Sequence, residues 1–183
     1  MDAFPVIETD RIKLRKPGIS DIPKIMEYAN NPRIAEMTLN IPHPYEAKDA
    51  IAWLQMANEG FEDQSHFVFG ICLLDGDEFI GGIGLNIEQK FNRAELGFWL
   101  AEPFWNQGYM TEAVIEVLAF GFDKLKLNKI YATHFWGNPA SGKVMAKNGM
   151  IKEAELKEHI RKDDEYKSLI QYRVTRREFE EMR

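Results

Sequence analysis

A short polar loop followed by a helical pattern could bind an anion. Asn106, Gln107 and Gly108 come just before a stretch whose apolar residues recur at helical spacing: Met110, Ala113, Val114, Val117, Leu118, Gly121 and Leu125. The first turn of a helix has backbone N–H groups without partners and carries about half a positive charge, so it can hold a phosphate without a lysine. A glycine there allows close approach to the backbone. A glycine before a helix is also an ordinary cap, so this motif alone does not establish a phosphate site.

Two polar side chains stand in patterns that could serve a second ligand. Glu95 alternates onto the same face of an expected strand as Gly97 and Trp99. Ser141 follows Asn138 by three residues, so both lie on one face of an expected helix. A carboxylate such as Glu95 can bind or deprotonate an amine, and the alternative is an ordinary surface carboxylate of the sheet. For Ser141 the alternative is a plain residue of the first helical turn.

These residues are carried by alternating strand and helix patterns. The expected strands are 6–15, 67–74, 78–87, 93–100, 129–136, 150–160 and 166–175. The expected helices are 20–30, ended by Asn30-Asn31-Pro32, then 45–59, about 110–125, 139–147, and a short one that finishes at Met182. Asp75-Gly76-Asp77 is a hairpin turn signal. Asn138-Pro139 is a helix start, and Lys147-Asn148-Gly149 is a helix end.

The order of these elements predicts an α+β fold. Antiparallel strands come first, and a strand-helix-strand-helix-strand run follows. This order gives a mixed, mostly antiparallel central sheet of six or seven strands with helices on both faces. The length of 183 residues suits one domain, and neither a linker nor an internal repeat divides the chain. A single domain over residues 1–183 is therefore expected.

The charge balance favours a cationic partner. The chain has 23 Lys and Arg against 29 Asp and Glu, a formal net charge of −6, with a pI near 5.3. Such a surface repels phosphate backbones and anionic membranes, which argues against nucleic acid and membrane partners. No stretch approaches the ~20 apolar residues that span a bilayer, and residues 1–5 lack the pattern of a secretion signal. A cytoplasmic location is therefore expected.

Redox and metal chemistry are not indicated by the cysteine and histidine pattern. Cys72 is the single cysteine and lies in an apolar run, so a buried strand thiol is expected and an intrachain disulfide is impossible. His43, His66 and His159 show no metal-ligand spacing. His134 lies in an expected strand, where a packed ring is the usual role. No metal is expected.

The loop and its surroundings resemble the GCN5-related N-acetyltransferase (GNAT) superfamily. The pyrophosphate loop of that superfamily reads Gln/Arg-x-x-Gly-x-Gly/Ala, between the fourth strand and the third helix. The segment here is similar to the ribosomal-protein N-terminal acetyltransferase branch at Trp105, Gly108, Tyr109, Thr111, Glu112 and Ala113. Met110 replaces the Gly/Ala position, so its side chain must point away from the ligand. Further matches follow in the family's order: 7–15 with Asp21, 94–100, and the pattern from Asn138 to Gly149.

The resemblance implies acetyl-coenzyme A as the cofactor. In the superfamily the fourth and fifth strands diverge, and free backbone groups of the fourth bind the pantetheine arm and the thioester carbonyl. That points to the backbone of Phe98, Trp99 and Leu100. Asn138 would meet the pantetheine amides or cap its own helix, and Lys143 would reach the adenosine 3′-phosphate or remain a solvated lysine. The phosphates would lie on the loop and first turn, formed by Asn106, Gln107, Gly108, Tyr109, Met110 and Thr111.

The resemblance also implies direct attack of a primary amine on the thioester in a ternary complex. Such a reaction needs a neutral amine, stabilisation of a developing oxyanion, and a proton for the departing sulfur. Glu95 is the candidate base, acting directly or through water, or else a group that orients the amine. Many relatives use a tyrosine as the acid, and that position here is Met145. The similar branch has a serine at the place of Ser141, which is therefore the candidate acid, with water as the alternative.

The identity of the acceptor amine is inferred only from the branch that the sequence resembles. A protein N-terminal α-amine, of the ribosomal-protein type, is expected. A small cationic amine, such as a polyamine or an aminoglycoside, is the main alternative, and a non-catalytic acyl-coenzyme A sensor is an alternative of another class. Tyr45 and Trp53, near the expected acceptor mouth, either contact substrate or pack within the fold. The sequence leaves open the identity of the acceptor and whether the protein is a monomer or a homodimer.

Overall fold

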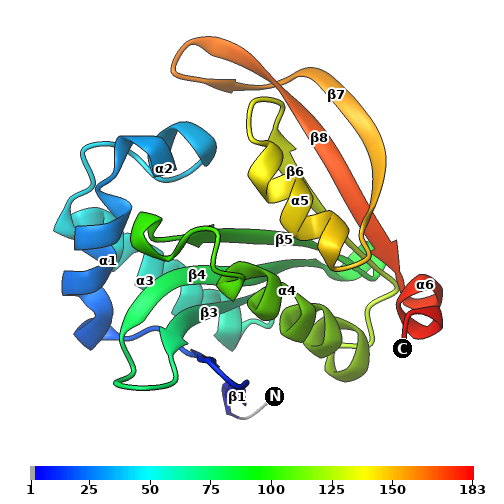
Figure 1. The fold of residues 1–183 in the computed structure, drawn as a ribbon, viewed down its shortest axis with the longest axis horizontal. Helices are drawn as coiled ribbons and strands as arrows, with labels where there is room; N and C mark the ends of the chain where they lie inside the picture. The colour runs from blue at the N-terminus through cyan, green and yellow to red at the C-terminus, as the bar shows by residue number, and fades with distance from the viewer. Residues whose placement is uncertain (1–2) are drawn as a thin grey trace.

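The computed structural model describes residues 3–183, which form one eight-stranded sheet with helices against it (Figure 1). Its strands are β1 (Ile7–Glu8), β2 (Ile12–Arg15), β3 (His66–Leu73), β4 (Phe79–Glu88), β5 (Arg93–Leu100), β6 (Lys129–Phe135), β7 (Ile151–Lys162) and β8 (Glu165–Thr175). Its α-helices are α1 (Ile22–Ala29), α2 (Pro32–Met37), α3 (Ala47–Glu62), α4 (Tyr109–Ala119), α5 (Pro139–Lys147) and α6 (Arg176–Glu181). Within the described residues, no helix is both long and apolar enough to cross a bilayer. Residues 1–5 lack a secretion-signal pattern, and the first two of them lie outside the described range.

The sheet is mixed and mostly antiparallel, as the sequence predicted. Its strands follow the order β1-β2-β3-β4-β5-β6-β8-β7. Neighbouring strands run antiparallel, except that β5 and β6 pair in parallel. The expected α+β class is therefore confirmed, and the β5–β6 pair is connected through α4, which packs against the sheet (Figure 1).

The sheet has more strands than expected because the first segment folds back on itself. Residues 6–15 were expected to form one strand, but they form β1 and β2, paired antiparallel with Ile7 opposite Leu14. Thr9 makes the turn, since its N–H donates to the Ile12 carbonyl at 2.9 Å and its hydroxyl oxygen accepts the Ile12 N–H at 3.1 Å. Threonine and aspartate side chains that bond to nearby backbone favour such turns. The alternation of apolar residues does not distinguish one long strand from two short ones.

The proline signal after α1 marks a helix start as well as a helix end. The sequence predicted only a break at Asn31-Pro32, but α2 begins there. The side chain of Asn31 accepts the Arg33 N–H at 2.9 Å, and Pro32 occupies the first helical turn. The same cap-then-proline signal at Asn138-Pro139 does begin α5, as predicted. The Asn-Pro motif therefore begins a helix at both places, whereas the sequence analysis predicted a helix start only at Asn138-Pro139.

Helices cover both faces of the sheet and enclose two apolar cores. Against one face, α4 buries Val114 and Leu118 over β-strand residues such as Phe69 and Leu96. Against the other face, α1 and α3 bury a smaller cluster that includes Ile25 and Leu54. Fully burying one such side chain contributes roughly 1.5–3 kcal/mol, so the cores hold the sheet in a fixed shape. Cys72 lies fully buried in the smaller cluster, as expected, and burial raises the pKa of its thiol to about 12.

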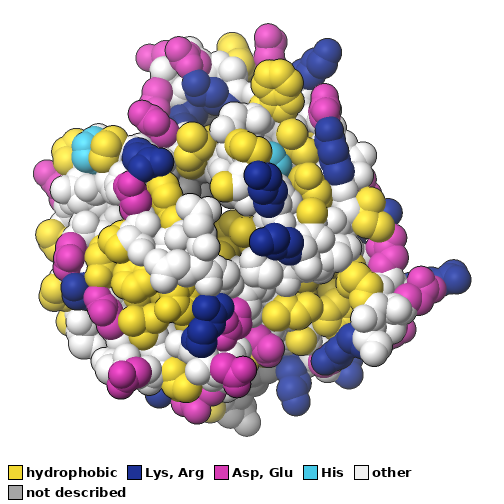
Figure 2. All heavy atoms as spheres, in the orientation of Figure 1, with side chains coloured by type: hydrophobic (Ala, Val, Ile, Leu, Met, Phe, Trp, Pro, Cys, Tyr) yellow, Lys and Arg dark blue, Asp and Glu magenta, His cyan; other side chains and the backbone are white. Residues whose placement is uncertain are grey.

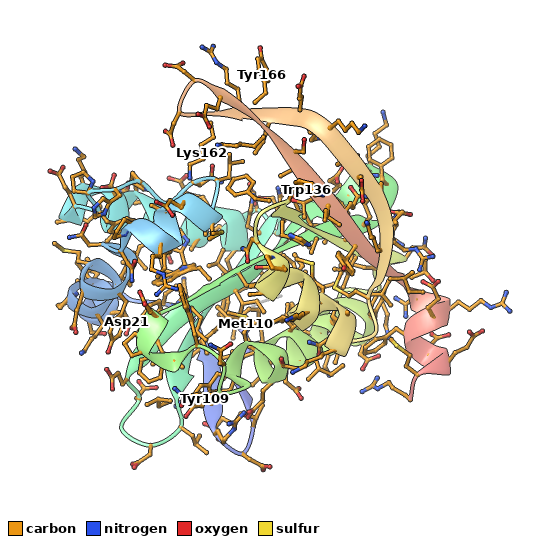
Figure 3. The ribbon with its side chains drawn as sticks, turned by 45° about the horizontal axis from the view of Figure 1, so that its top comes forward. Asp21, Tyr109, Met110, Trp136, Lys162 and Tyr166 are labelled. Atoms are coloured by element: carbon orange, nitrogen blue, oxygen red, sulfur yellow. The ribbon has the colours of Figure 1, made fainter. Side chains whose placement is uncertain are left out.

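The long β7–β8 hairpin arches over α5 and extends toward α2 (Figure 1). Lys162 lies at the end of β7, and its ammonium donates to the carbonyls of Ala35 and Thr38 at the C-terminal end of α2 (Figure 3). The C-terminal end of a helix carries partial negative charge, which favours this contact. The hairpin and the first helices are thereby tied together, although they are far apart in the sequence.

A buried ion pair joins β2 to the start of α1. The Arg15 guanidinium donates two hydrogen bonds of 2.8 Å to Asp21, which is 5% exposed, and the Gly18 N–H donates a third. Burial alone would raise the pKa of Asp21, but the Arg15 and Gly18 hydrogen bonds outweigh burial and lower it. A carboxylate whose pKa is lowered in the folded state stabilises that state above its ordinary pKa.

We expect Asp21→Asn to lower the free energy of unfolding by about 3 kcal/mol at pH 7, because it leaves the Arg15 charge only partly compensated. Urea unfolding followed by circular dichroism measures the change. The matched control is Asp77→Asn, which removes the exposed partner of Arg15 and should cost less than about 1 kcal/mol. The gap between Asp21→Asn and wild type should shrink as the pH falls from ~3.9 through the lowered pKa of Asp21. Equal losses in both variants would contradict this assignment.

Candidate active site

The divergence of β5 and β6 opens a cleft through the sheet. The two strands pair only from Arg93 to Glu95, opposite Lys129 to Tyr131. Beyond that point β5 keeps its pairing with β4, and β6 keeps its pairing with β8. The space between them is part of a cavity of about 780 Å³. The strand divergence expected from the family resemblance is therefore present.

The cleft has one wall at α5 and another at α3 and the segment before it. The lining on the α5 side comprises Leu96 and Phe98 of β5, His134 of β6, and Asn138, Ser141 and Met145 at the cap and within α5. The opposite wall includes Tyr45, Trp53 and Met56, together with residues 37–42, which begin at the last residue of α2. Glu95, Thr133 and Trp99 also line the cavity, in the passage between β5 and β6. The cleft therefore brings Glu95 and Ser141, the two predicted catalytic residues, to a single cavity.

Glu95 is the carboxylate of the passage and is largely shielded from water. Its Oε1 accepts a hydrogen bond of 3.2 Å from the Thr133 hydroxyl on β6. Burial raises the pKa of Glu95, the Thr133 hydrogen bond opposes that rise, and the charge of Glu88 adds to it. A carboxylate with a raised pKa is a stronger base near neutral pH than an exposed one. This environment is compatible with the predicted role of Glu95 as a base.

Ser141 and Asn138 form a closed pair at the N-terminus of α5. The Asn138 side-chain carbonyl accepts the Ser141 N–H at 3.4 Å, and its amide group donates to the Ser141 hydroxyl oxygen at 3.0 Å. Both ends of the Asn138 side chain are thus used within the helix cap. Of the two competing roles considered for Asn138, the structure shows the cap. The Ser141 hydroxyl hydrogen remains free to point elsewhere, because Oγ serves as an acceptor in this bond.

The three predicted backbone contacts of β5 differ in their surroundings. Phe98 and Trp99 line the cleft. Leu100 packs into the core, and its carbonyl accepts a 2.7 Å hydrogen bond from the Trp105 indole N–H. That bond explains the tryptophan before the loop: it ties the loop to the end of β5. The Leu100 carbonyl therefore already accepts one hydrogen bond within the protein.

The predicted phosphate loop has the backbone shape that its glycine permits. Gly108 caps α4 with φ +87°, and Asn106 is also left-handed with φ +60°. The predicted orientation of Met110 is correct, because its side chain is 6% exposed and packs in the core (Figure 3). Gln107 folds back, with its side-chain amide donating to the Pro103 carbonyl. Tyr109 and Thr111 complete the first turn, whose N–H groups lack helical acceptors.

Arg11 and Glu112 brace this loop, a role that the sequence analysis did not assign. The Arg11 guanidinium bonds to Glu112 at 2.6 and 2.8 Å and donates to the Gln107 carbonyl at 2.9 Å. It also lies over the Tyr109 ring, 4.6 Å from the centroid. Thr9 donates to the same carboxylate. The β1–β2 turn therefore supports the loop, and the match at Arg11 and Glu112 could have suggested their pairing.

Basic side chains gather over α5 (Figure 2). Lys143 lies on this helix but lines neither described cavity, whereas Lys147 lines a second cavity of about 690 Å³. That cavity lies beside the loop, because Gly108 and Thr111 also line it. Lys147 is thus better placed than Lys143 to meet a ligand group next to the loop. Sequence spacing could not separate the two lysines, since they are four residues apart and share a helix face.

His134 is a packed ring, as expected, but one of its nitrogens has no partner. The residue is 6% exposed, and its ring lies 5.8 Å from that of Tyr172. Its Nδ1 bonds to the Phe135 carbonyl at 2.8 Å. Among residues 3–183, its Nε2 is the buried side-chain nitrogen or oxygen for which no hydrogen-bond partner is found. No local sequence pattern indicated this unpartnered nitrogen.

We expect Thr133→Val to raise the pKa of Glu95 further, because the Thr133 hydroxyl stabilises the ionised carboxylate. A titration of the carboxyl carbon of Glu95 by NMR measures the change. Thr38→Val is the control, since the Thr38 hydroxyl bonds to the Ile34 carbonyl instead. A Glu95 pKa that falls or stays constant in Thr133→Val would show that this hydrogen bond does not form.

Comparison with known proteins identifies the family. Residues 11–151 match the model of the acetyltransferase (GNAT) domain. The N-acetyltransferase YoaA of Bacillus subtilis is 30% identical over 158 residues, which covers 86% of this chain and 89% of the relative. The ribosomal protein uS5-alanine N-acetyltransferase of Escherichia coli is 26% identical over 118 residues, covering 63% and 61%. A GNAT-family acetyltransferase structure from Bacillus anthracis has a TM-score of 0.84 at 23% identity, covering 94% and 99%.

The family match and the site geometry coincide along the chain. The matched segment begins just before β2 and ends at the first residue of β7. It therefore contains the diverging strands β5 and β6, the glycine-capped start of α4, and the Asn138–Ser141 cap of α5. Because the family model matches residues 11–151, well over half of the chain, and these parts lie inside the matched region, the chain belongs to the GNAT family of acetyl-CoA-dependent N-acetyltransferases.

Proposed function

We propose that this acetyltransferase moves the acetyl group of acetyl-CoA to the α-amino group of a protein N-terminus. Acetyl-CoA supplies the activated thioester carbonyl. The observation that carries the proposal is the cleft through the sheet, where Glu95 and Ser141 line one cavity. A cofactor arm can enter beside α5 and an amine can enter from the side of α3. The two reactants then meet between β5 and β6.

On the cofactor side, this chain offers groups that bind and orient. The first-turn N–H groups of α4 hold the diphosphate, and Gly108 gives the loop before them its left-handed φ of +87°. The backbone of Phe98 and Trp99 lines the route of the arm. The Ser141 hydroxyl passes its proton to the departing sulfur and takes up the second proton that the attacking nitrogen must lose. The Asn138 amide, which donates to the Ser141 oxygen, stabilises the negative charge that develops there.

On the acceptor side, Glu95 removes the proton from the incoming ammonium. An α-ammonium has a pKa of about 8, so a base with a raised pKa can take its proton directly or through a water. The Thr133 hydroxyl orients the carboxylate toward the passage. Only the deprotonated carboxylate can act as a base. The reaction rate is therefore expected to rise with pH through the raised pKa of Glu95.

The lining of the acceptor side suits one ammonium group attached to a partly apolar chain. Apolar and aromatic side chains dominate it, among them Tyr45, Trp53 and Met56. Glu95 and Asp49 are the carboxylates of the lining, and Asp49 is already bonded to the Glu46 N–H at 2.8 Å. A polyamine carries several ammonium groups that each need a partner, which this lining supplies poorly. One relative is named as an N-acetyltransferase of an alanine in ribosomal protein uS5, which supports a protein amine as the acceptor.

We expect Gly108→Val to weaken CoA binding at least 10-fold, because a branched side chain at φ +87° strains the loop and its Cβ would lie 3.3 Å from the Arg11 guanidinium that holds the loop. Isothermal titration with CoA measures the affinity. Gly76→Val is a matched control, since Gly76 has φ +78° in a remote hairpin turn with open space around it. The control suffers similar backbone strain and should bind CoA normally. Wild-type affinity in Gly108→Val would refute the phosphate-loop assignment.

The proposed acceptor is tested by thiol release from acetyl-CoA with several amines. We expect turnover with short peptides that have a free N-terminus and little with spermidine or an aminoglycoside. The same peptides with a blocked N-terminus and an internal lysine should be inactive. Glu95→Gln should lower kcat/KM about 100-fold, while the exposed Glu59→Gln on α3 should not. Faster turnover with spermidine would support the polyamine alternative, and CoA binding without turnover for any amine would support the sensor alternative.

A further inference from the structure

Gly97 is a glycine in the middle of β5 that the fold itself does not require. Glycine weakens a strand interior, and it usually marks a left-handed conformation, a bulge or a place where another group approaches closely. The φ of Gly97 is not in the left-handed region, and the β4–β5 register runs without a shift. Apart from its neighbours in the chain, no atom lies within 4 Å of a Cβ atom built on Gly97. Neither the backbone nor the packing of the described chain therefore explains this glycine.

Two glycines of β4 on the same face of the sheet do have structural reasons. Gly84 is paired with Gly97, and a Cβ atom there would lie 2.8 Å from the Phe67 carbonyl oxygen of β3. Gly82 is paired with Trp99, and a Cβ atom there would lie 2.8 Å from the indole nitrogen. Of these three glycines, Gly97 is the one that faces open space. Its partner Gly84 places no side chain over that space.

The open space above Gly97 belongs to the acceptor side of the cleft. Gly97 is exposed and lines the cavity of about 780 Å³. Alternation along β5 puts it on the face of Glu95 and Trp99, and Trp99 packs against the smaller apolar cluster of α1 and α3. Leu96 and Phe98, on the other face, pack in the core beneath α4. A ligand group above Gly97 is therefore part of the acceptor rather than of the cofactor arm beside α5.

The space above Gly97 lies about one amino-acid residue away from the carboxylate of Glu95. Alternate residues of a strand are about 6.6 Å apart, so Gly97 follows Glu95 at that distance. In the other direction, from Arg93 to Glu95, β5 is paired with β6, so the passage opens toward Gly97. An α-amine held at Glu95 therefore has the rest of its own residue next to Gly97.

The far end of this space is aromatic. A Cβ atom added at Gly82 would lie 3.0 Å from the Trp53 ring as well as close to the Trp99 indole, so both rings lie over Gly82. Both tryptophans also line the cavity. A group that extends from Glu95 across Gly97 therefore meets aromatic rings, which favours an apolar group over a charged one.

We propose that Gly97 is a specificity-determining residue, whose open space receives an apolar side chain of the acceptor's first residue. This inference rests on the proposed transfer of acetyl to a protein N-terminus. A side chain at position 97 would occupy the same space. The largest first residue that fits would then become smaller, while the amine could still reach Glu95.

The test uses three peptides that differ only in their first residue, which is glycine, alanine or methionine. Thiol release at saturating acetyl-CoA gives kcat/KM for each peptide. We expect Gly97→Ala to lower kcat/KM by less than about twofold for the glycine peptide and by about 10-fold or more for the methionine peptide. The alanine peptide should show an intermediate loss. Isothermal titration should give the same CoA affinity in Gly97→Ala as in the wild type.

Gly18→Ala is the matched control. Gly18 lies between β2 and α1 with φ −133°, and a Cβ atom there would meet the Ser20 hydroxyl oxygen at an ordinary distance of 3.9 Å. The control should keep wild-type kcat/KM with all three peptides, because Gly18 does not line the cleft.

Gly97→Ala should fold at least as well as the wild type. Alanine reduces the conformational freedom of the unfolded chain, and its Cβ has open space in the folded state. We expect the midpoint of thermal unfolding to rise by about 1–4 °C, followed by circular dichroism. A loss of activity with the methionine peptide then cannot come from unfolding. A lowered midpoint would contradict the view that the fold does not require this glycine.

The outcomes separate this inference from the proposed function. An equal loss of kcat/KM for all three peptides, or no loss for any of them, would overturn the inference alone. Weaker CoA binding in Gly97→Ala would also overturn it, because the space would then belong to the cofactor. Failure of the wild-type protein to acetylate any of the peptides would overturn the proposed function, and this inference with it.

Discussion

The site depends on the short parallel pairing between β5 and β6. Each strand has a full partner on its outer side: β4 accompanies β5 along all of its length, and β8 accompanies β6 from Lys129 to Phe135. Those outer ladders hold the two strands in place when their own pairing stops at Glu95. The inner edges beyond that point lack a strand partner, and unpaired backbone groups are unfavourable unless water or a ligand satisfies them. The fold thus builds a binding slot out of the middle of a sheet, between two strands that are themselves firmly held.

The parts around the slot are positioned by contacts with the protein rather than with a ligand. Trp105 ties the loop to the end of β5, and the pair of Arg11 and Glu112 supports the loop from the β1–β2 turn. Asn138 and Ser141 bond to each other at the start of α5. Groups that are fixed before binding lose less conformational entropy when a ligand arrives. The described site therefore has the character of a preorganised one, in which the chain itself has set the positions of the loop and the helix starts.

Much of the fold could be predicted from the sequence, because many signals are local. The hairpin turn at residues 75–77, the start of α5 at Asn138-Pro139 and its end near Asn148 all depend on residues adjacent in the chain. The fold-back at Thr9 and the existence of α2 were missed, since each local pattern there fits two structures. Glu95 and Ser141 were predicted as site residues, and the structure brings them to one cavity. Their chemical roles remain predictions. The unpartnered nitrogen of His134 and the placement of Lys147 depend on neighbours distant in sequence, so no local pattern could indicate them.

The contact between Lys162 and the end of α2 has an evolutionary consequence. Its two acceptors are the carbonyls of Ala35 and Thr38, which belong to the main chain and exist whatever side chains occupy those positions. Substitutions in α2 and in residues 37–42 can therefore change the wall of the acceptor side without removing the acceptors that Lys162 uses. A descendant enzyme could acquire a different amine preference by drift in this segment while the hairpin stays attached. Because the attachment uses main-chain atoms, the architecture can be inherited unchanged while the amine selectivity diverges.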